Sequence, residues 1–109
     1  DRGGFVPRGF TSNAPPRAMA TLRAIARLLR PVGIEAVDEG FGGVDIAPMI
    51  ESGVIQVGLR PDPARYFDFH HSENDVVEAV HPRELQQGAA AMAALLYVVA
   101  DLPEALPRE

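Results

Sequence analysis

The sequence predicts an α/β fold, and more specifically one part of a three-layer α/β/α sandwich with a mainly parallel sheet. Two observations support this fold class: two long segments carry apolar residues at helical spacing, and two short apolar runs between them are typical of strands. Two or three strands make a poor sheet by themselves. We therefore expect the remaining strands to lie upstream, with residues 1–109 forming the C-terminal part of a single domain.

The first helix is expected after residues 1–16, which are rich in glycine and proline and predict a loop. Residues 11–13 (TSN) offer N-caps, and Pro15 or Pro16 suits a first helical turn. Pro31 and Gly33 end the helix. Its apolar stripe recurs at spacings of three and four and consists of Met19, Leu22, Ala26 and Leu29.

The middle of the chain predicts two strands. The first is short, over Ile34–Val37, and is followed by the glycine-rich loop 39–45. A brief helical turn then ends at Gly53. The second strand is the β-branched apolar run Val54–Leu59, which is typical of a buried strand. Residues 60–75 form a long connection with two prolines, and long connections in compact domains tend to carry function.

The second long helix is expected to begin with Pro82 at its first position, which makes His81 a residue of the helix entrance. Its alanine-rich body suits close packing against a sheet. The stripe expected to face the core has a four-three-four-three rhythm and consists of Leu85, Ala89, Met92, Leu96 and Val99.

Composition excludes several classes of function. The formal net charge of −5 comes without a basic stripe, so we expect no nucleic-acid partner. No apolar run approaches the roughly 20 residues of a membrane span. The absence of cysteine rules out disulfides and cysteine-based zinc sites. The chain begins at Asp1 without methionine, which suggests a fragment or a processed product.

The stretch Arg65–Asp75 (RYFDFHHSEND) holds the adjacent histidines His70 and His71. Imidazole and carboxylate together suit zinc, so a metal site is one interpretation. The alternative is structural, because Ser72–Asp75 matches a capping box before a helix start at Val76. Adjacent histidines usually point in different directions, so we expect only one of them to bind an ion.

Other motifs are weaker. The loop 39–45 (EGFGGVD) lacks the spacing and the lysine of a phosphate-binding loop, so its glycines predict a tight turn. Asp45 follows these glycines and is a candidate for the pocket or for the cap of the next turn. No serine stands in a nucleophile elbow, which argues against a serine hydrolase.

Three separated motifs resemble metallopeptidase family twenty-eight and, within it, the carboxypeptidase Q group. They are residues 42–54 (GGVDIAPMIESGV), 58–85 (GLRPDPARYFDFHHSENDVVEAVHPREL) and 89–109. They occur in the family's order and span nearly the whole chain. The resemblance implies a co-catalytic zinc exopeptidase on an α/β/α sandwich, with two zinc ions held by two histidines, a bridging aspartate, another aspartate and a glutamate.

The resemblance also assigns residues. The family's late histidine ligand directly precedes Ser or Thr, which maps to His71, and a further aspartate ligand maps to Asp1. His70, Asp75, Asp45 and Tyr66 are expected in the second shell or the substrate pocket. The remaining ligands and the general base belong upstream. One departure is Val76, where the family often has threonine.

For the intact protein the resemblance implies a short peptide or dipeptide substrate, a secreted or periplasmic location and a homodimer as one possible assembly. The chain alone is expected to be inactive. Two alternatives stay open. One is an acyltransferase similar to zinc glutaminyl cyclases, and the other is a non-catalytic binding or dimerisation module on the same scaffold.

Overall fold

A computed structural model describes residues 2–109, and its two long helices are those expected from the sequence. Helix α1 begins at Pro16 and α3 at Pro82, and the short turn before Gly53 is also present, as a 3₁₀ helix over Ala47–Ser52. The order of strands and α-helices is β1 (Pro7–Ser12), α1 (Pro16–Leu28), β2 (Ala36–Glu39), β3 (Val57–Pro61), α2 (Tyr66–Phe69) and α3 (Pro82–Ala100).

The central strand of the sheet, β1, was not predicted. Residues 1–16 were expected to be a loop, yet Pro7–Ser12 pairs with both other strands, in the order β2-β1-β3. Proline, glycine and arginine in this strand hide its strand character, because burial and pairing on both sides decide its conformation. The sheet is mixed rather than mainly parallel over the described residues, since β1 runs parallel to β2 and antiparallel to β3.

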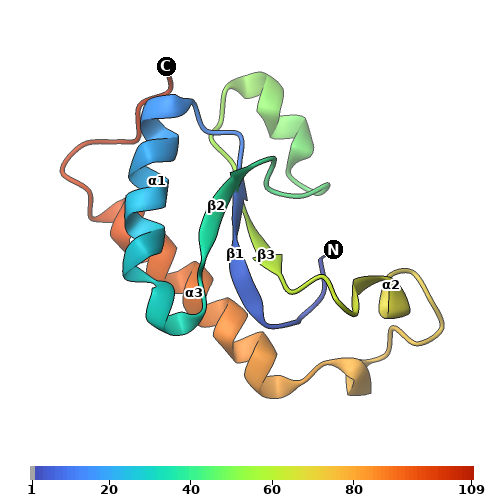
Figure 1. Ribbon diagram of the computed structural model, residues 1–109. Helices are drawn as coiled ribbons and strands as arrows, with labels where there is room; N and C mark the ends of the chain where they lie inside the picture. The colour runs from blue at the N-terminus through green and yellow to red at the C-terminus, as the bar shows by residue number, and fades with distance from the viewer. Residues whose placement is uncertain (1) are drawn as a thin grey trace.

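Both long helices cover the same face of the sheet (Figure 1). Phe10 of β1 lies at the centre of the core, with no exposed surface, and Val37 of β2 lies beside it. The predicted stripe of α1 is confirmed, because its four residues are all buried against the sheet. From α3 the core receives Ala91 and Leu95.

Most of the face of α3 that was expected to pack is wrong, although its last residue, Val99, is partly buried against the core. Leu85, Met92 and Leu96 are 54 %, 36 % and 69 % exposed, whereas Gly88, Ala91 and Leu95 are buried. From Gly88 to Ala100 every residue of this helix is apolar, aromatic or glycine, so periodicity does not choose a face. The face is instead chosen by how closely the helix approaches the sheet. A Cβ at Gly88 would lie 3.0 Å from Leu59 Cδ2, so the small residues face the sheet.

Several predicted boundaries and caps are also wrong. Strand β2 is displaced by two residues toward Glu39, and β3 begins three residues later than expected, at Val57. The N-cap of α1 is Pro15, without a side-chain cap. Ser12 instead donates to Gln56 O at 2.6 Å and accepts from Ala14 N at 3.1 Å. Its hydroxyl therefore joins the end of β1 to the approach to β3.

Among the residues that the structure describes, no helix combines the length and the apolar character needed to cross a bilayer.

Candidate functional site

The histidine segment follows β3 and is built around the short helix α2. This single turn runs over Tyr66–Phe69, was not predicted, and has His70 as its C-cap residue. The two phenylalanines within this helix differ in their surroundings. Phe69 contacts the ring of Phe5 at 5.8 Å, whereas Phe67 is 84 % exposed. The aromatic residues thus attach one side of the turn to the N-terminal segment.

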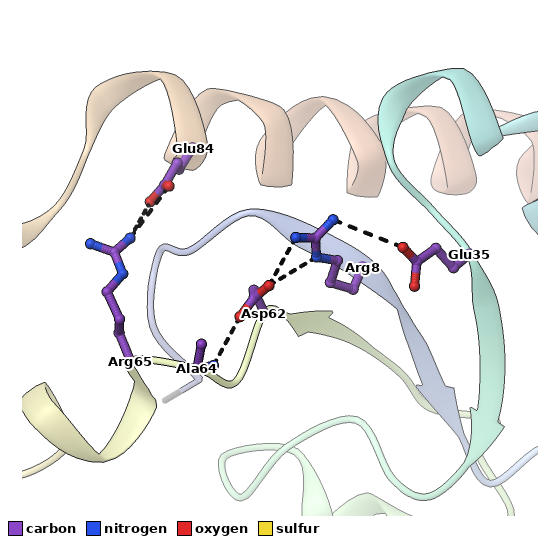
Figure 2. A network of polar contacts seen from close by, with 6 residues as sticks. All are labelled: Arg8, Glu35, Asp62, Ala64, Arg65 and Glu84. Atoms are coloured by element: carbon purple, nitrogen blue, oxygen red, sulfur yellow. Dashed lines mark hydrogen bonds and ion pairs between the residues drawn. The ribbon is translucent and has the colours of Figure 1, made fainter.

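Two ion pairs hold this segment to the rest of the domain (Figure 2). Arg8 of β1 donates from Nε and Nη2 to Asp62 Oδ2 at 3.0 and 2.9 Å, just after β3. Arg65, directly before α2, lies 3.1 Å from Glu84 of α3. The histidines are therefore tethered at the start of their segment both to the sheet and to α3.

Asp62 gives this tether a pH dependence. The hydrogen bond from Ala64 N at 2.9 Å, followed by those from Arg8, lowers the pKa of Asp62 below its ordinary value of 3.8. Ionised Asp62 therefore stabilises the fold above the unfolded-state pKa, and this contribution is lost as the pH falls through the lower folded-state pKa.

Replacing Asp62 with asparagine should lower the melting temperature of the protein at pH 7. The difference from wild type should begin to shrink as the pH falls below the ordinary value of 3.8, and should be lost once the pH passes the lower pKa of Asp62 in the folded protein. Thermal unfolding of both proteins followed by circular dichroism at several pH values measures this. A difference that is constant from pH 7 to pH 2.5 would contradict the role of the charge.

The two adjacent histidines lie side by side, contrary to the expectation that they point in different directions. Their rings stack with centroids 4.0 Å apart and planes at 20°. Tyr66 stacks on the other side of His70 at 4.5 Å, and its hydroxyl lies 3.4 Å from His70 Nε2. The order Tyr66, His70, His71 forms one continuous stack, in which His70 is half-buried and His71 is exposed.

The backbone of His71 explains this arrangement. Its φ is +52°, and among the described residues it is the single non-glycine position with a positive φ. Left-handed backbone is uncommon outside glycine, although histidine adopts it more often than most residues. Such a conformation costs on the order of 1–3 kcal/mol and is concentrated at functional sites. The turn places the His71 ring beside that of His70.

The histidine stack forms one wall of a hollow of about 320 Å³. The glycine-rich loop after β2 also lines this hollow, and Arg2 contributes from the N-terminal segment. Sequence reasoning missed Arg2 and the two apolar side chains of the loop. The sequence offers one signal for each: Arg2 follows the expected ligand Asp1, and Phe41 and Val44 lie within the glycine-rich motif. The lining residues are Arg2, Phe41, Gly43, Val44, Tyr66, His70 and His71.

Asp75 lies away from this hollow. It lines a smaller, separate pocket together with Tyr66, His70 and Val80. The predicted capping box is wrong, because no α-helix begins at Val76 and the following 3₁₀ turn has no side-chain cap. Ser72 Oγ instead donates to Phe69 O at 2.8 Å and accepts from Asn74 N at 3.2 Å. The serine thereby closes the turn that carries His71.

Asp45 is exposed and lines a neighbouring hollow that also contains Arg2 and Gly43. It does not cap the following turn, which has no side-chain cap. The loop itself lies close against β3, because a Cβ at Gly58 would be 2.5 Å from Gly42 O. Glycine in the strand therefore allows the loop that lines the histidine hollow to approach the sheet.

The described residues include only one of the two predicted metal ligands, His71. Asp1, the second predicted ligand, lies outside the residues that the structure describes. Over residues 2–109, no group of three or more His, Asp or Glu side chains is arranged to hold a metal ion. The donor type nevertheless fits zinc, since an exposed imidazole lines a hollow and imidazole is a common zinc ligand.

Comparison with known proteins identifies the relatives of this chain. It is 39 % identical over 108 residues to carboxypeptidase Q of Rattus norvegicus, and 37 % and 35 % identical to those of Homo sapiens and Xenopus laevis. The chain is homologous to carboxypeptidase Q. The crystal structure of a peptidase M28 precursor from Shewanella amazonensis SB2B superposes with a TM-score of 0.84 at 27 % identity, covering 98 % of this chain. No family model matches the chain.

These comparisons confirm the predicted resemblance to metallopeptidase family twenty-eight near carboxypeptidase Q, and the α/β fold with it. The alignment includes 99 % of this chain but only 23 % of each carboxypeptidase Q, and 24 % of the peptidase M28 chain. The chain thus spans about a quarter of the length of its relatives.

Proposed function

We propose that this chain is the C-terminal part of the catalytic domain of a co-catalytic zinc exopeptidase, which hydrolyses the terminal peptide bond of a dipeptide or short peptide. The similarity to carboxypeptidase Q over 108 residues supports this proposal most strongly. Residues 1–109 would contribute two zinc ligands, His71 and Asp1, and the partner ligands and the general base would come from upstream. A secreted or periplasmic location and a homodimer belong to the same proposal.

His71 is the proposed ligand for a physical reason beyond its place in the motif. Its left-handed backbone is maintained despite its cost, and its ring lies on the wall of a hollow of about 320 Å³. The ring of His70 stacks directly on that of His71, and the ring of Tyr66 stacks on that of His70. In the proposed enzyme these contacts hold the His71 ring in place. Packing of this kind fixes the rotamer of a ligating side chain and so preorganises a site.

Zinc, when bound, would polarise the scissile carbonyl and lower the pKa of a bound water toward neutrality. The chain's own residues would orient the substrate. Phe41, Val44 and Tyr66 line the hollow and would exclude water from the bond to be cleaved. Asp45 lines the neighbouring hollow, which shares Arg2 and Gly43 with this one, and would lie at the edge of the substrate pocket. Asp75 lines the separate smaller pocket and would act only through Tyr66 and His70, which line both.

The full-length protein tests this function directly. Purified enzyme should release free amino acids from unsubstituted dipeptides, as followed by chromatography, and a zinc chelator should abolish the release. Restoring zinc should restore it. Failure to cleave any dipeptide or blocked terminal substrate, with metal bound, would favour a non-catalytic module, and cyclisation of an N-terminal glutamine would favour the acyltransferase alternative.

A further inference from the structure

We propose that Arg2 is a specificity-determining residue that selects substrates carrying a carboxylate, an inference that rests on the proposed peptidase function. Arg2 is half-buried and lines the same hollow as His71. The other lining side chains, apart from the histidines, are Phe41, Val44 and Tyr66. A single permanent cation in a mostly apolar and aromatic hollow is the type of polar group that fixes ligand orientation.

The guanidinium group is held in place by the sheet and by the loop. Nη1 donates to Thr11 Oγ1 at 2.8 Å and to Leu59 O at 3.5 Å. Nη2 donates to Phe41 O at 3.0 Å, and the group lies 5.6 Å from the centroid of the Phe41 ring. The side chain is therefore fixed before substrate binds, which reduces the entropy cost of binding.

This anchoring leaves both donors and charge for a ligand. A guanidinium has five N–H groups, and the three hydrogen bonds above leave Nε and one hydrogen of Nη2. All three acceptors are neutral oxygens. Within residues 2–109, no carboxylate forms an ion pair with Arg2, although Asp45 lines the neighbouring hollow. Over the described residues the positive charge therefore has no carboxylate partner, and in the proposed enzyme a substrate carboxylate would supply one.

The carboxylate could belong to an acidic side chain or to the C-terminus of the peptide, and matched substrates separate the two. Four dipeptide substrates are needed: one with glutamate, its glutamine counterpart, and the C-terminal amide of each. Charge-assisted hydrogen bonds contribute about ten-fold or more in affinity. We expect full-length wild type to prefer glutamate over glutamine, or acid over amide, by about ten-fold in kcat/KM.

The variants Arg2→Met and Arg2→Lys then test the residue itself. Arg2→Met should reduce the preference to about one while still cleaving the neutral substrate, and Arg2→Lys should keep part of it. Arg27→Met is the control, because Arg27 is exposed on α1 outside the hollow and should leave the preference unchanged. A wild type without any preference, or an Arg2→Met that retains it, would overturn the inference. Wild-type enzyme that cleaves none of the four peptides would instead contradict the proposed function.

Discussion

Replacing His71 with asparagine in the full-length protein should lower kcat/KM for dipeptides by at least about 100-fold. Loss of an outer-shell partner of a metal typically costs 10–100-fold, and loss of a direct ligand should exceed this. Asparagine is chosen because it tolerates the left-handed backbone that His71 adopts, with φ of +52°. The fold should therefore survive the substitution. Steady-state hydrolysis of a dipeptide, at equal folded protein concentration, measures the effect.

His81→Asn is the matched control for this variant. His81 is the N-cap of α3, where its Nδ1 accepts from Arg83 N at 3.2 Å, and asparagine is an equally good N-cap. Its prediction as a helix-entrance residue is confirmed. We expect His81→Asn to retain wild-type activity and stability. Similar activity of the His71→Asn variant and wild type would contradict the assignment of His71.

Replacing Phe10 with alanine should lower the free energy of unfolding of the full-length protein by about 3–5 kcal/mol. Phe10 has no exposed surface, lies on the central strand, and contacts the core formed with both long helices. Its removal leaves a cavity that the rigid sheet cannot close. Urea unfolding followed by circular dichroism provides the measurement.

Phe67→Ala is the control of identical chemistry. Phe67 is 84 % exposed on α2, so its truncation should change the free energy of unfolding by no more than about 0.5 kcal/mol. Equal losses for the two variants would show that β1 is not the centre of the core. This comparison tests the element that the sequence did not predict.

The long helices could be predicted because local signals and burial agree in them. Pro16 and Pro82 stand at the first helical position, and the stripe of α1 matches its buried face. The face of α3 could not be predicted, because Gly88 and Ala91 are selected by close approach to the sheet rather than by hydrophobicity. Strand β1 was missed for a related reason, since its pairing partners are distant in sequence.

In the candidate site, too, features with a local sequence signal could be predicted and features set by tertiary contacts could not. The histidine motif and its neighbour Tyr66 could be found from the sequence, as could the family resemblance that the comparisons confirm. The stacked arrangement could not, because it depends on the backbone conformation of one residue, His71. Arg2 and Phe41 were missed because tertiary contacts bring the N-terminal segment and the glycine-rich loop to the same hollow.

Metal analysis of the full-length protein tests the central claim most directly. Wild type should contain close to two zinc ions per chain after purification without chelator, as measured by inductively coupled plasma mass spectrometry. The His71→Asn variant should lose about one of them while keeping the wild-type circular dichroism spectrum. Equal zinc content in the two proteins would contradict the proposal that His71 is a metal ligand.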